Sequence, residues 1–291
     1  MARRALAAIT LAVIAGASLA APAVAACPGV GLVTRIDGLP QNVIITRIEN
    51  GKQVLVWRPR VLEVVCEADL IHTIGSTSVF ILVDGRGSVR VNRDLDYRVP
   101  ARSGSPSLAG NAYRNISDQV MPDMKRLPWN VRVKGGGDDF GFALSTLSAG
   151  GQQVQSGRRT LLIRLVGGTP PYRVDIATAA GAPVASQTSS SHEVVVADVA
   201  LAAGPYQIKA VDAAPNAVTA QVAAVDLRPP ADAAFAGLAD PEIRAAATAT
   251  ALARTHPGVW SFEAEQQLQA APQDGLDRDK VYELIESYSA E

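Results

Sequence analysis

The residues that could support catalysis are few in this sequence, and they are widely separated. The histidines are His72, His192 and His256. His192 follows the serine run 189–191, an arrangement in which a serine nucleophile could use a nearby histidine as its base. A polar strand edge after a loop explains the same run more simply, because serine is common in turns. No G-x-S-x-G element is present either, so we expect no hydrolase of that class.

Two pairs of aspartates have a spacing that could serve acid catalysis or metal binding. Asp94 and Asp96 would share one face of a strand, as the paired acids of a glycosidase require, but exposed charge also protects an edge strand. Asp138 and Asp139 follow the glycine run 135–137, yet calcium needs about six or more oxygen ligands. The sequence has no zinc-type C-x-x-C or H-x-x-x-H pair, and no lysine follows the glycine run as in a phosphate-binding loop. We therefore expect no catalytic residue, no metal and no cofactor.

The first 25 residues have the pattern of an export signal. Two arginines precede an apolar run at residues 5–20, and the small residues 23–25 form a cleavage site. The net charge of −1 becomes −3 once Arg3 and Arg4 are removed, so the mature chain lacks a basic surface for nucleic acid. No later stretch is apolar enough to span a bilayer. We expect export to the bacterial periplasm, with no transmembrane span in the mature chain.

Cys27 and Cys66 are the two cysteines of the chain. Two cysteines in an exported protein favour one disulfide bond between them. The alternative is a lipid anchor, because residues 24–27 resemble a lipobox in which Cys27 would be lipidated. We prefer the disulfide, since lipidation would leave Cys66 as an odd thiol in an oxidising compartment.

Residues 26–100 have mostly strand signals. The apolar run 78–83 ends at Asp84-Gly85, and residues 88–92 alternate between apolar and polar, which predicts a hairpin. Because apolar residues occupy both faces of the run 78–83, we expect both faces to be covered. Phe80 would then belong to a core, and its truncation to alanine would cost ~3–5 kcal/mol.

The residues before this hairpin also resemble a known family. Asp69, Thr73 and Gly75-Ser76 follow Cys66 in that order, before the apolar strand that ends in Asp84-Gly85. This order is similar to the FecR-type periplasmic domain, over about residues 31–100. The resemblance implies a β fold and a general binding or signalling role. FecR itself has a transmembrane helix and regulates a sigma factor; this chain has an export signal instead, so that role is not carried over.

Residues 141–228 have the pattern of a second β region. Short alternating segments separated by turns predict an antiparallel sandwich. The Gly-Gly-Thr-Pro-Pro-Tyr element at 167–172 and the Gly-Pro-Tyr element at 204–206 are similar to bacterial Ig-like repeats, which implies an Ig-like β-sandwich. Between the two β regions, residues 101–140 have the glycine, serine and proline content of a linker.

Residues 229–291 have helical signals. Asp240 is suited to cap a helix that begins at Pro241, and the turn at 256–258 should end it. A helix is expected at about 262–270, and another should begin near Asp277. That last helix carries an apolar stripe at helical spacing, formed by Val281, Leu284, Ile285 and Tyr288. An isolated helix of about a dozen residues is marginal, so we expect the stripe to dock within the chain, in a small helical cap, rather than on a partner.

Together these signals predict a mainly β protein with a small C-terminal α-helical segment. The expected parts are a signal peptide (1–25), a FecR-like β domain (26–100), a linker (101–140), an Ig-like antiparallel β-sandwich (141–228) and the helical segment (229–291). We expect an exported, non-enzymatic binding, signalling or assembly protein of the cell envelope, with an envelope protein or a cell-wall polymer as partner. A hydrolase of cell-wall sugar or peptide and a purely structural envelope protein are the alternatives.

Overall fold

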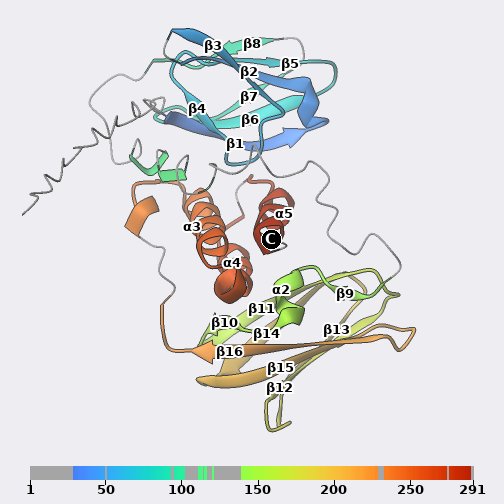
Figure 1. Ribbon diagram of the computed structural model, residues 1–291. Coiled ribbons are helices and arrows are strands. Elements are labelled where there is room, and N and C mark those ends of the chain that lie inside the picture. Colours follow the sequence, from blue (N-terminus) through green and yellow to red (C-terminus); the bar gives the residue numbers. More distant parts are fainter. Residues whose placement is uncertain are drawn as a thin grey trace, which may run out of the picture.

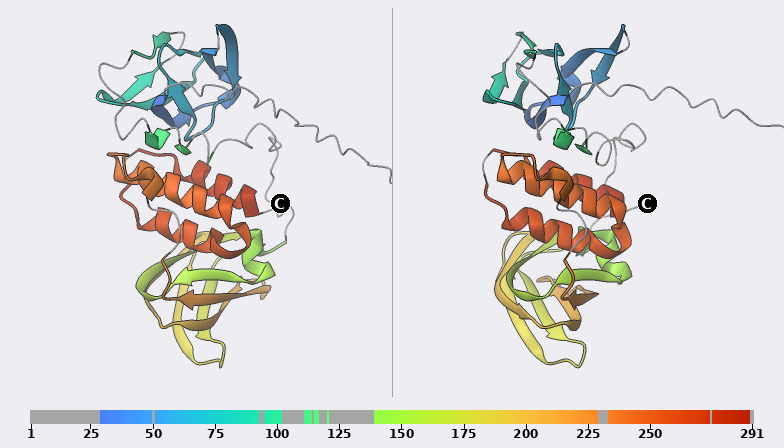
Figure 2. Two further views of the ribbon diagram at one scale, coloured as in Figure 1. Left: turned by 60° about the vertical axis from the view of Figure 1, so that its left-hand side comes forward. Right: turned by 90° about the vertical axis from the view of Figure 1, so that its left-hand side faces the viewer.

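Three layers stack along the long axis of the molecule, as Figures 1 and 2 show. A β domain from the first part of the chain lies at one end, and a β-sandwich lies at the other. Three helices from the last part of the chain lie between them. The mainly β fold with C-terminal helices is therefore confirmed. The computed structural model describes residues 29–49, 51–92, 95–101, 111–113, 115–116, 120, 139–228, 233–273 and 275–289, and the predicted signal peptide lies outside these ranges.

The N-terminal β domain consists of two antiparallel sheets that face each other. The sheet nearer the helices has the order β4-β1-β6-β7, with β1 (Gly29–Asp37), β4 (Val64–Cys66), β6 (Ser78–Val83) and β7 (Gly87–Val91). The farther sheet has the order β3-β2-β5-β8, with β2 (Val43–Glu49), β3 (Lys52–Trp57), β5 (Leu70–Thr73) and β8 (Asp96–Arg98). A short 3-10 turn, η1 (Pro40–Asn42), joins β1 to β2. Apolar residues from both sheets fill the space between them, among them Val33, Val43, Ile45, Ile71, Val79 and Ile81.

The strands β6 and β7 form the predicted hairpin around Asp84-Gly85. One face of β6 is buried in the domain core, but Phe80 on the other face is only half-buried. The prediction that Phe80 belongs to a covered core is therefore wrong. Its ring lies between two cations, with the guanidinium carbons of Arg35 and Arg90 at 4.2 and 5.3 Å from the ring centroid. Cation–π contacts thus cover Phe80, while Leu82 on the same face packs against the helical core.

Cys66 ends strand β4, where it is buried opposite Gly29 of β1. Cys27 lies outside the described residues, so the disulfide stays a prediction. Two extended residues span about 7 Å at most, and Cys27 is two positions before Gly29, which keeps a Cys27–Cys66 bond within reach. We expect the intact mass of the mature protein to rise by two hydrogen atoms on reduction, and the lost cross-link to cost ~3–4 kcal/mol for a loop of about 40 residues. Two free thiols before reduction, or a diacylglycerol mass on Cys27, would contradict this.

The β-sandwich consists of a larger and a smaller sheet. The larger has the order β10-β16-β15-β12-β13, with β10 (Gln152–Gln155), β12 (Tyr172–Thr178), β13 (Pro183–Ser189), β15 (Gly204–Val211) and β16 (Ala217–Val225). The smaller has the order β14-β11-β9, with β9 (Gly141–Phe142), β11 (Gly157–Val166) and β14 (Glu193–Leu201), and a short helix, α2 (Ser145–Ala149), follows β9. Strand β10 pairs with β16 in parallel, and the other pairs are antiparallel. The alternating residues face the core as predicted, among them Leu161, Ile163, Tyr172, Val174, Ile176, Val194 and Ile208.

The helical layer consists of α3 (Pro241–Thr255), α4 (Pro257–Ala270) and α5 (Arg278–Ser289). Asp240 caps α3 as predicted, because its Oδ1 accepts hydrogen bonds from the backbone N–H groups of Glu242 and Ile243 at 2.8 and 3.0 Å. His256 separates α3 from α4. The predicted docking of the last helix within the chain is confirmed, since its whole stripe is buried: Val281, Leu284, Ile285 and Tyr288.

The helical layer joins the two β regions rather than capping one of them. Leu32 and Leu62 of the N-terminal domain belong to the same apolar core as the helices, and Leu162 of β11 reaches it from the sandwich. Phe262 of α4 belongs instead to the sandwich core. The segment 101–140, predicted as a linker, also supplies buried residues to the helical core: Ala112, Tyr113, Ile116 and Val120. Its serine- and proline-rich run lies outside the described residues.

Candidate functional site

The side chain of His192 holds a loop of the sandwich in place. Among the described residues, its hydrogen bonds join it to Tyr172 and Gly167, and not to a serine of the run 189–191. Its Nε2 atom lies 2.8 Å from Oη of Tyr172 and 3.1 Å from the carbonyl oxygen of Gly167. The hydroxyl of Ser189 accepts a hydrogen bond from the backbone N–H of Ser191 at 2.9 Å. These contacts brace the turn before β14, which agrees with the interpretation of this run as a polar loop.

The other sequence candidates lie apart from His192. His72 on β5 pairs with Asp96 on β8, with 2.7 Å between Nδ1 and Oδ1, and both side chains are partly exposed. Asp139 is exposed, while Asp94 and Asp138 lie outside the described residues. Within the ranges given above, no three His, Cys, Asp or Glu side chains are placed so that they could hold a metal ion.

The most conspicuous surface feature is an apolar patch on the outer side of the sheet β3-β2-β5-β8, which is the sheet farther from the helices (Figure 1). Side chains alternate along a strand, so the neighbours of the buried Val43 and Ile45 point outward. Ile48 is 73% exposed and Leu55 is 50% exposed. We call this surface the apolar face and define it by four outward apolar residues around Thr46: the exposed Ile48 and Leu55 and the half-buried Ile44 and Leu70.

The apolar face lies next to the edge of its sheet. Strand β3 has β2 as its one partner strand among the described residues. Glu49 pairs with Lys52 beside the hairpin turn, and antiparallel pairs alternate in hydrogen bonding. The backbone N–H and C=O groups of Gln53 and Leu55 therefore point away from β2. Leu55 thus presents an exposed apolar side chain and an edge backbone in the same place.

Charged and polar side chains border the apolar face. His72 lies opposite Ile44 in the strand register, and Arg98 lies opposite Leu70. The His72–Asp96 ion pair continues this border along β8. Apolar residues inside a polar rim are the usual layout of a protein-binding surface, and here they surround the one hydroxyl of Thr46. Clustered exposed apolar residues mark such surfaces.

A buried ion pair fixes strand β2 from the inner side of the same sheet. Arg47 donates from Nη2 to Oδ2 of Asp69 at 2.9 Å and to the carbonyl oxygen of Val64 at 2.7 Å. The backbone N–H of Cys66 donates to the same carboxylate at 2.8 Å. Asp69 entered the sequence argument only through a family resemblance, and its pairing with Arg47 was not predicted. A lone arginine between apolar residues of a strand was the signal that could have indicated it.

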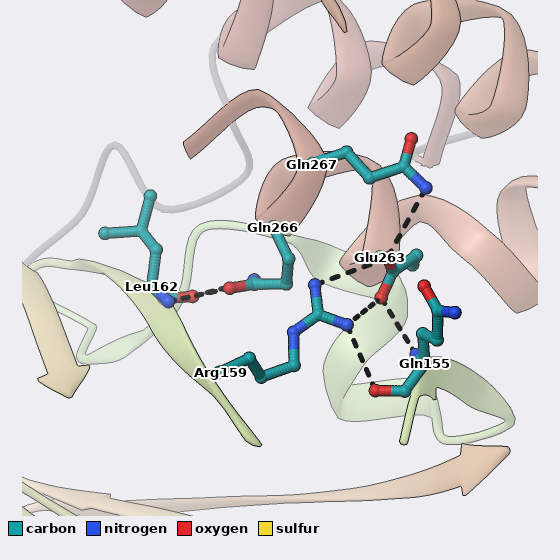
Figure 3. A network of polar contacts seen from close by, with 6 residues as sticks. All are labelled: Gln155, Arg159, Leu162, Glu263, Gln266 and Gln267. Carbon is teal, nitrogen blue, oxygen red and sulfur yellow. Dashed lines mark hydrogen bonds and ion pairs between the residues drawn. The ribbon is translucent and has the colours of Figure 1, made fainter. Parts of the chain in front are cut away.

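A second polar region lies where α4 meets the sandwich (Figure 3). Glu263 accepts hydrogen bonds from Nη1 of Arg159 at 2.8 Å and from the backbone N–H of Gln155 at 2.9 Å. Gln266 bonds both backbone groups of Leu162, accepting from its N–H at 2.7 Å and donating to its C=O at 3.0 Å. The amide side chain of Gln266 therefore makes the two backbone hydrogen bonds that a neighbouring strand would otherwise make to β11.

Comparisons with known proteins add no identity to this geometry. In the part of the chain that the structure describes, no helix has both the length and the apolar character needed to cross a bilayer. No protein-family model matches the sequence, and no curated protein is significantly similar to it.

Proposed function

We propose that the protein is an exported, non-enzymatic binding or assembly protein of the bacterial cell envelope. The observation that carries this proposal is the apolar face beside the edge strand β3. Large apolar side chains exposed together on one sheet are costly in water unless a partner covers them. The pattern of the first 25 residues supports export.

The partner is a protein that adds an extended segment to β3. Main-chain hydrogen bonds to Gln53 and Leu55 would continue the sheet, and an apolar side chain of the added strand would cover Leu55. Ile48 lies one strand further in, opposite Gln53, where a long apolar side chain of the partner could extend the contact. A strand with apolar residues at every second position satisfies both requirements, because its side chains alternate between the two faces. A cell-wall polymer offers neither a β backbone nor apolar side chains in that spacing.

We also propose the finer family assignments of the two β regions. A FecR-type domain at 26–100 is supported by the structural roles of two residues in the resembling element. Asp69 binds Arg47, and the Thr73 hydroxyl donates to the carbonyl oxygen of Asn92 at 2.7 Å. An Ig-like sandwich at 141–228 is supported by a contact between its two resembling elements. Asp212, which follows the strand that begins with the Gly-Pro-Tyr element, accepts a hydrogen bond at 2.9 Å from the backbone N–H of Thr169 in the Gly-Gly-Thr-Pro-Pro-Tyr element.

Replacing Ile48 and Leu55 together with threonine should weaken partner binding by roughly tenfold or more, since truncated apolar anchors at an interface cost on the order of 1–2 kcal/mol each. Threonine keeps a strong preference for strands, so the sheet should stay folded. The measurement immobilises the mature protein, incubates it with envelope extract and quantifies the partner protein that it retains. The matched control is Val195→Thr in the sandwich, a position 43% exposed on strand β14.

The Gln53→Pro variant tests strand addition separately from apolar contact. Proline is tolerated on an edge strand where the N–H faces away from the sheet, but it removes that donor. We expect it to reduce recovery of the same protein that depends on Ile48 and Leu55. Equal recovery by all variants would contradict the proposal, as would recovery of wall polymer in place of protein.

A further inference from the structure

Three glutamates and one arginine meet where α4, α5 and the sandwich come together. Arg164 of β11 forms ion pairs with Glu286 of α5 and with Glu193 of β14, the latter at 3.3 Å. Its guanidinium carbon also lies 4.5 Å from the ring centroid of Tyr282 on α5. Glu265 of α4 is 1% exposed and interacts electrostatically with these groups. We call these five residues the Arg164 cluster.

Glu265 has an incomplete set of partners at this position. Its Oε1 atom accepts no hydrogen bond from any described residue and is shielded from solvent. An ionised carboxylate in such a place is strongly unfavourable, and a protonated carboxyl group costs much less. Burial is the larger cause and repulsion from Glu286 the next, and together they raise the pKa of Glu265 from 4.5 to about 8. Burial likewise raises the pKa of Glu286 to about 7, although Arg164 opposes the shift.

Other charges on the elements around α4 do not balance the Arg164 cluster. The remaining cations with described contacts on these elements bind groups elsewhere: Arg159 with Glu263, Arg158 with Asp198, Arg278 with Glu242, Lys280 with Glu283, and Arg244 with the carbonyl oxygen of Leu238. One arginine therefore faces three carboxyl groups. The side chain of Glu193 is 47% exposed, so water offsets part of its charge. Full ionisation would still leave Arg164 facing two buried carboxylates, those of Glu265 and Glu286, with Glu283 adding repulsion on Glu286.

We propose that the contact between the sandwich and the helices α4 and α5 is a proton-dependent clasp, held closed while Glu265 is protonated and loosened when Glu265 and Glu286 are both ionised. The folded protein keeps these protons to a higher pH than the unfolded chain does. The stabilisation is therefore complete below the ordinary pKa of 4.5 and is lost as the pH rises through about 7 and about 8. The clasp is distant from the apolar face, which lies beyond the helical layer (Figure 1).

Hydrogen exchange on the full chain at about pH 6 and about pH 9, corrected for the intrinsic pH dependence, tests the clasp. We expect the protection of amides in α4 and β11 to fall at least about tenfold at the higher pH, while amides in β6 change less. Glu265→Gln keeps the shape but cannot ionise, so most of this loss should disappear. Asp279→Asn, an exposed position in the first turn of α5, is the matched control and should retain it.

Three results would overturn the clasp. The first is equal corrected protection at both pH values in the wild-type protein. The second is a Glu265→Gln variant that still loses its protection, and the third is an equal loss in β6, which would show global unfolding. A direct carboxyl titration of Glu265 by NMR in the wild-type protein covers the possibility that the variant does not fold. A midpoint near the ordinary 4.5 would refute the proposal.

Discussion

Replacing Asp69 with asparagine should lower the free energy of unfolding of the N-terminal β domain by ~3–5 kcal/mol, because it leaves the buried guanidinium of Arg47 without its carboxylate partner. The side chain of Asp69 is 0% exposed and that of Arg47 is 11% exposed, so water cannot replace the lost carboxylate. The backbone N–H of Cys66 would also lose its charged acceptor. The Arg47–Asp69 pair holds β2 on the inner side of the sheet, opposite the apolar face.

The measurement is urea unfolding, with hydrogen exchange at the amides of β2 and β5 as the local readout. Asp37→Asn is the matched control, because it breaks an ion pair with Arg35 whose side chains are 41% and 45% exposed. Exposed pairs contribute about 0–1 kcal/mol, so the control should barely shift the midpoint. Similar shifts for the two variants would show that the buried pair is hydrated. Replacing Arg47 and Asp69 together with apolar residues should cost less than Asp69→Asn alone.

Truncating Phe262 to alanine should destabilise the sandwich together with its contact to α4, by ~3–5 kcal/mol. Phe262 is 0% exposed, and it belongs to the sandwich core although it comes from a helix. Its loss would leave a cavity that the strands cannot close without moving α4. The unfolding transition of the sandwich, read at amides of β11 and β15, should move to lower denaturant concentration.

Phe80→Ala is the matched control for this cavity. Phe80 is half-buried between Arg35 and Arg90, so its loss removes cation–π contacts of about 0.5–1 kcal/mol each and leaves no closed cavity. A larger effect at Phe80 than at Phe262 would mean that the face of β6 is more tightly covered than its exposure indicates. The local sequence favoured the wrong one of these two phenylalanines, because Phe80 stands in an apolar run while Phe262 stands between Ser261 and Glu263.

Local signals in the sequence were sufficient for the elements and their ends. The Asp-Gly turn, the Asp240 cap and the stripe around Ile285 each depend on a few neighbouring residues, and each is found as predicted. The stripe shows that one side of α5 is buried, but a period of 3.6 residues carries no information about what covers it. The position of the helices between the two β regions therefore could not be predicted.

The apolar face and the Arg164 cluster escaped prediction for different reasons. Residues 43–45 are apolar on both sides of β2, so the alternation that separates an inner from an outer face is missing there. Glu265 and Glu286 have the type and spacing of ordinary exposed helix residues. Their burial results from tertiary packing between segments more than a hundred positions from Arg164. The one sequence signal was α4 itself, whose apolar residues surround the helix instead of forming one stripe.

The helices that join the two β regions follow both of them in the chain, and this order has a consequence for biogenesis. A nascent chain that is made from its N-terminus completes both β regions before Pro241 exists. Until then, Leu62 and Leu162 have no helix to cover them. A chain truncated before α3 would consist of two β regions that no helical layer holds together. Each region would expose apolar residues that the helices normally cover. We expect such a product to be a substrate for chaperones and proteases.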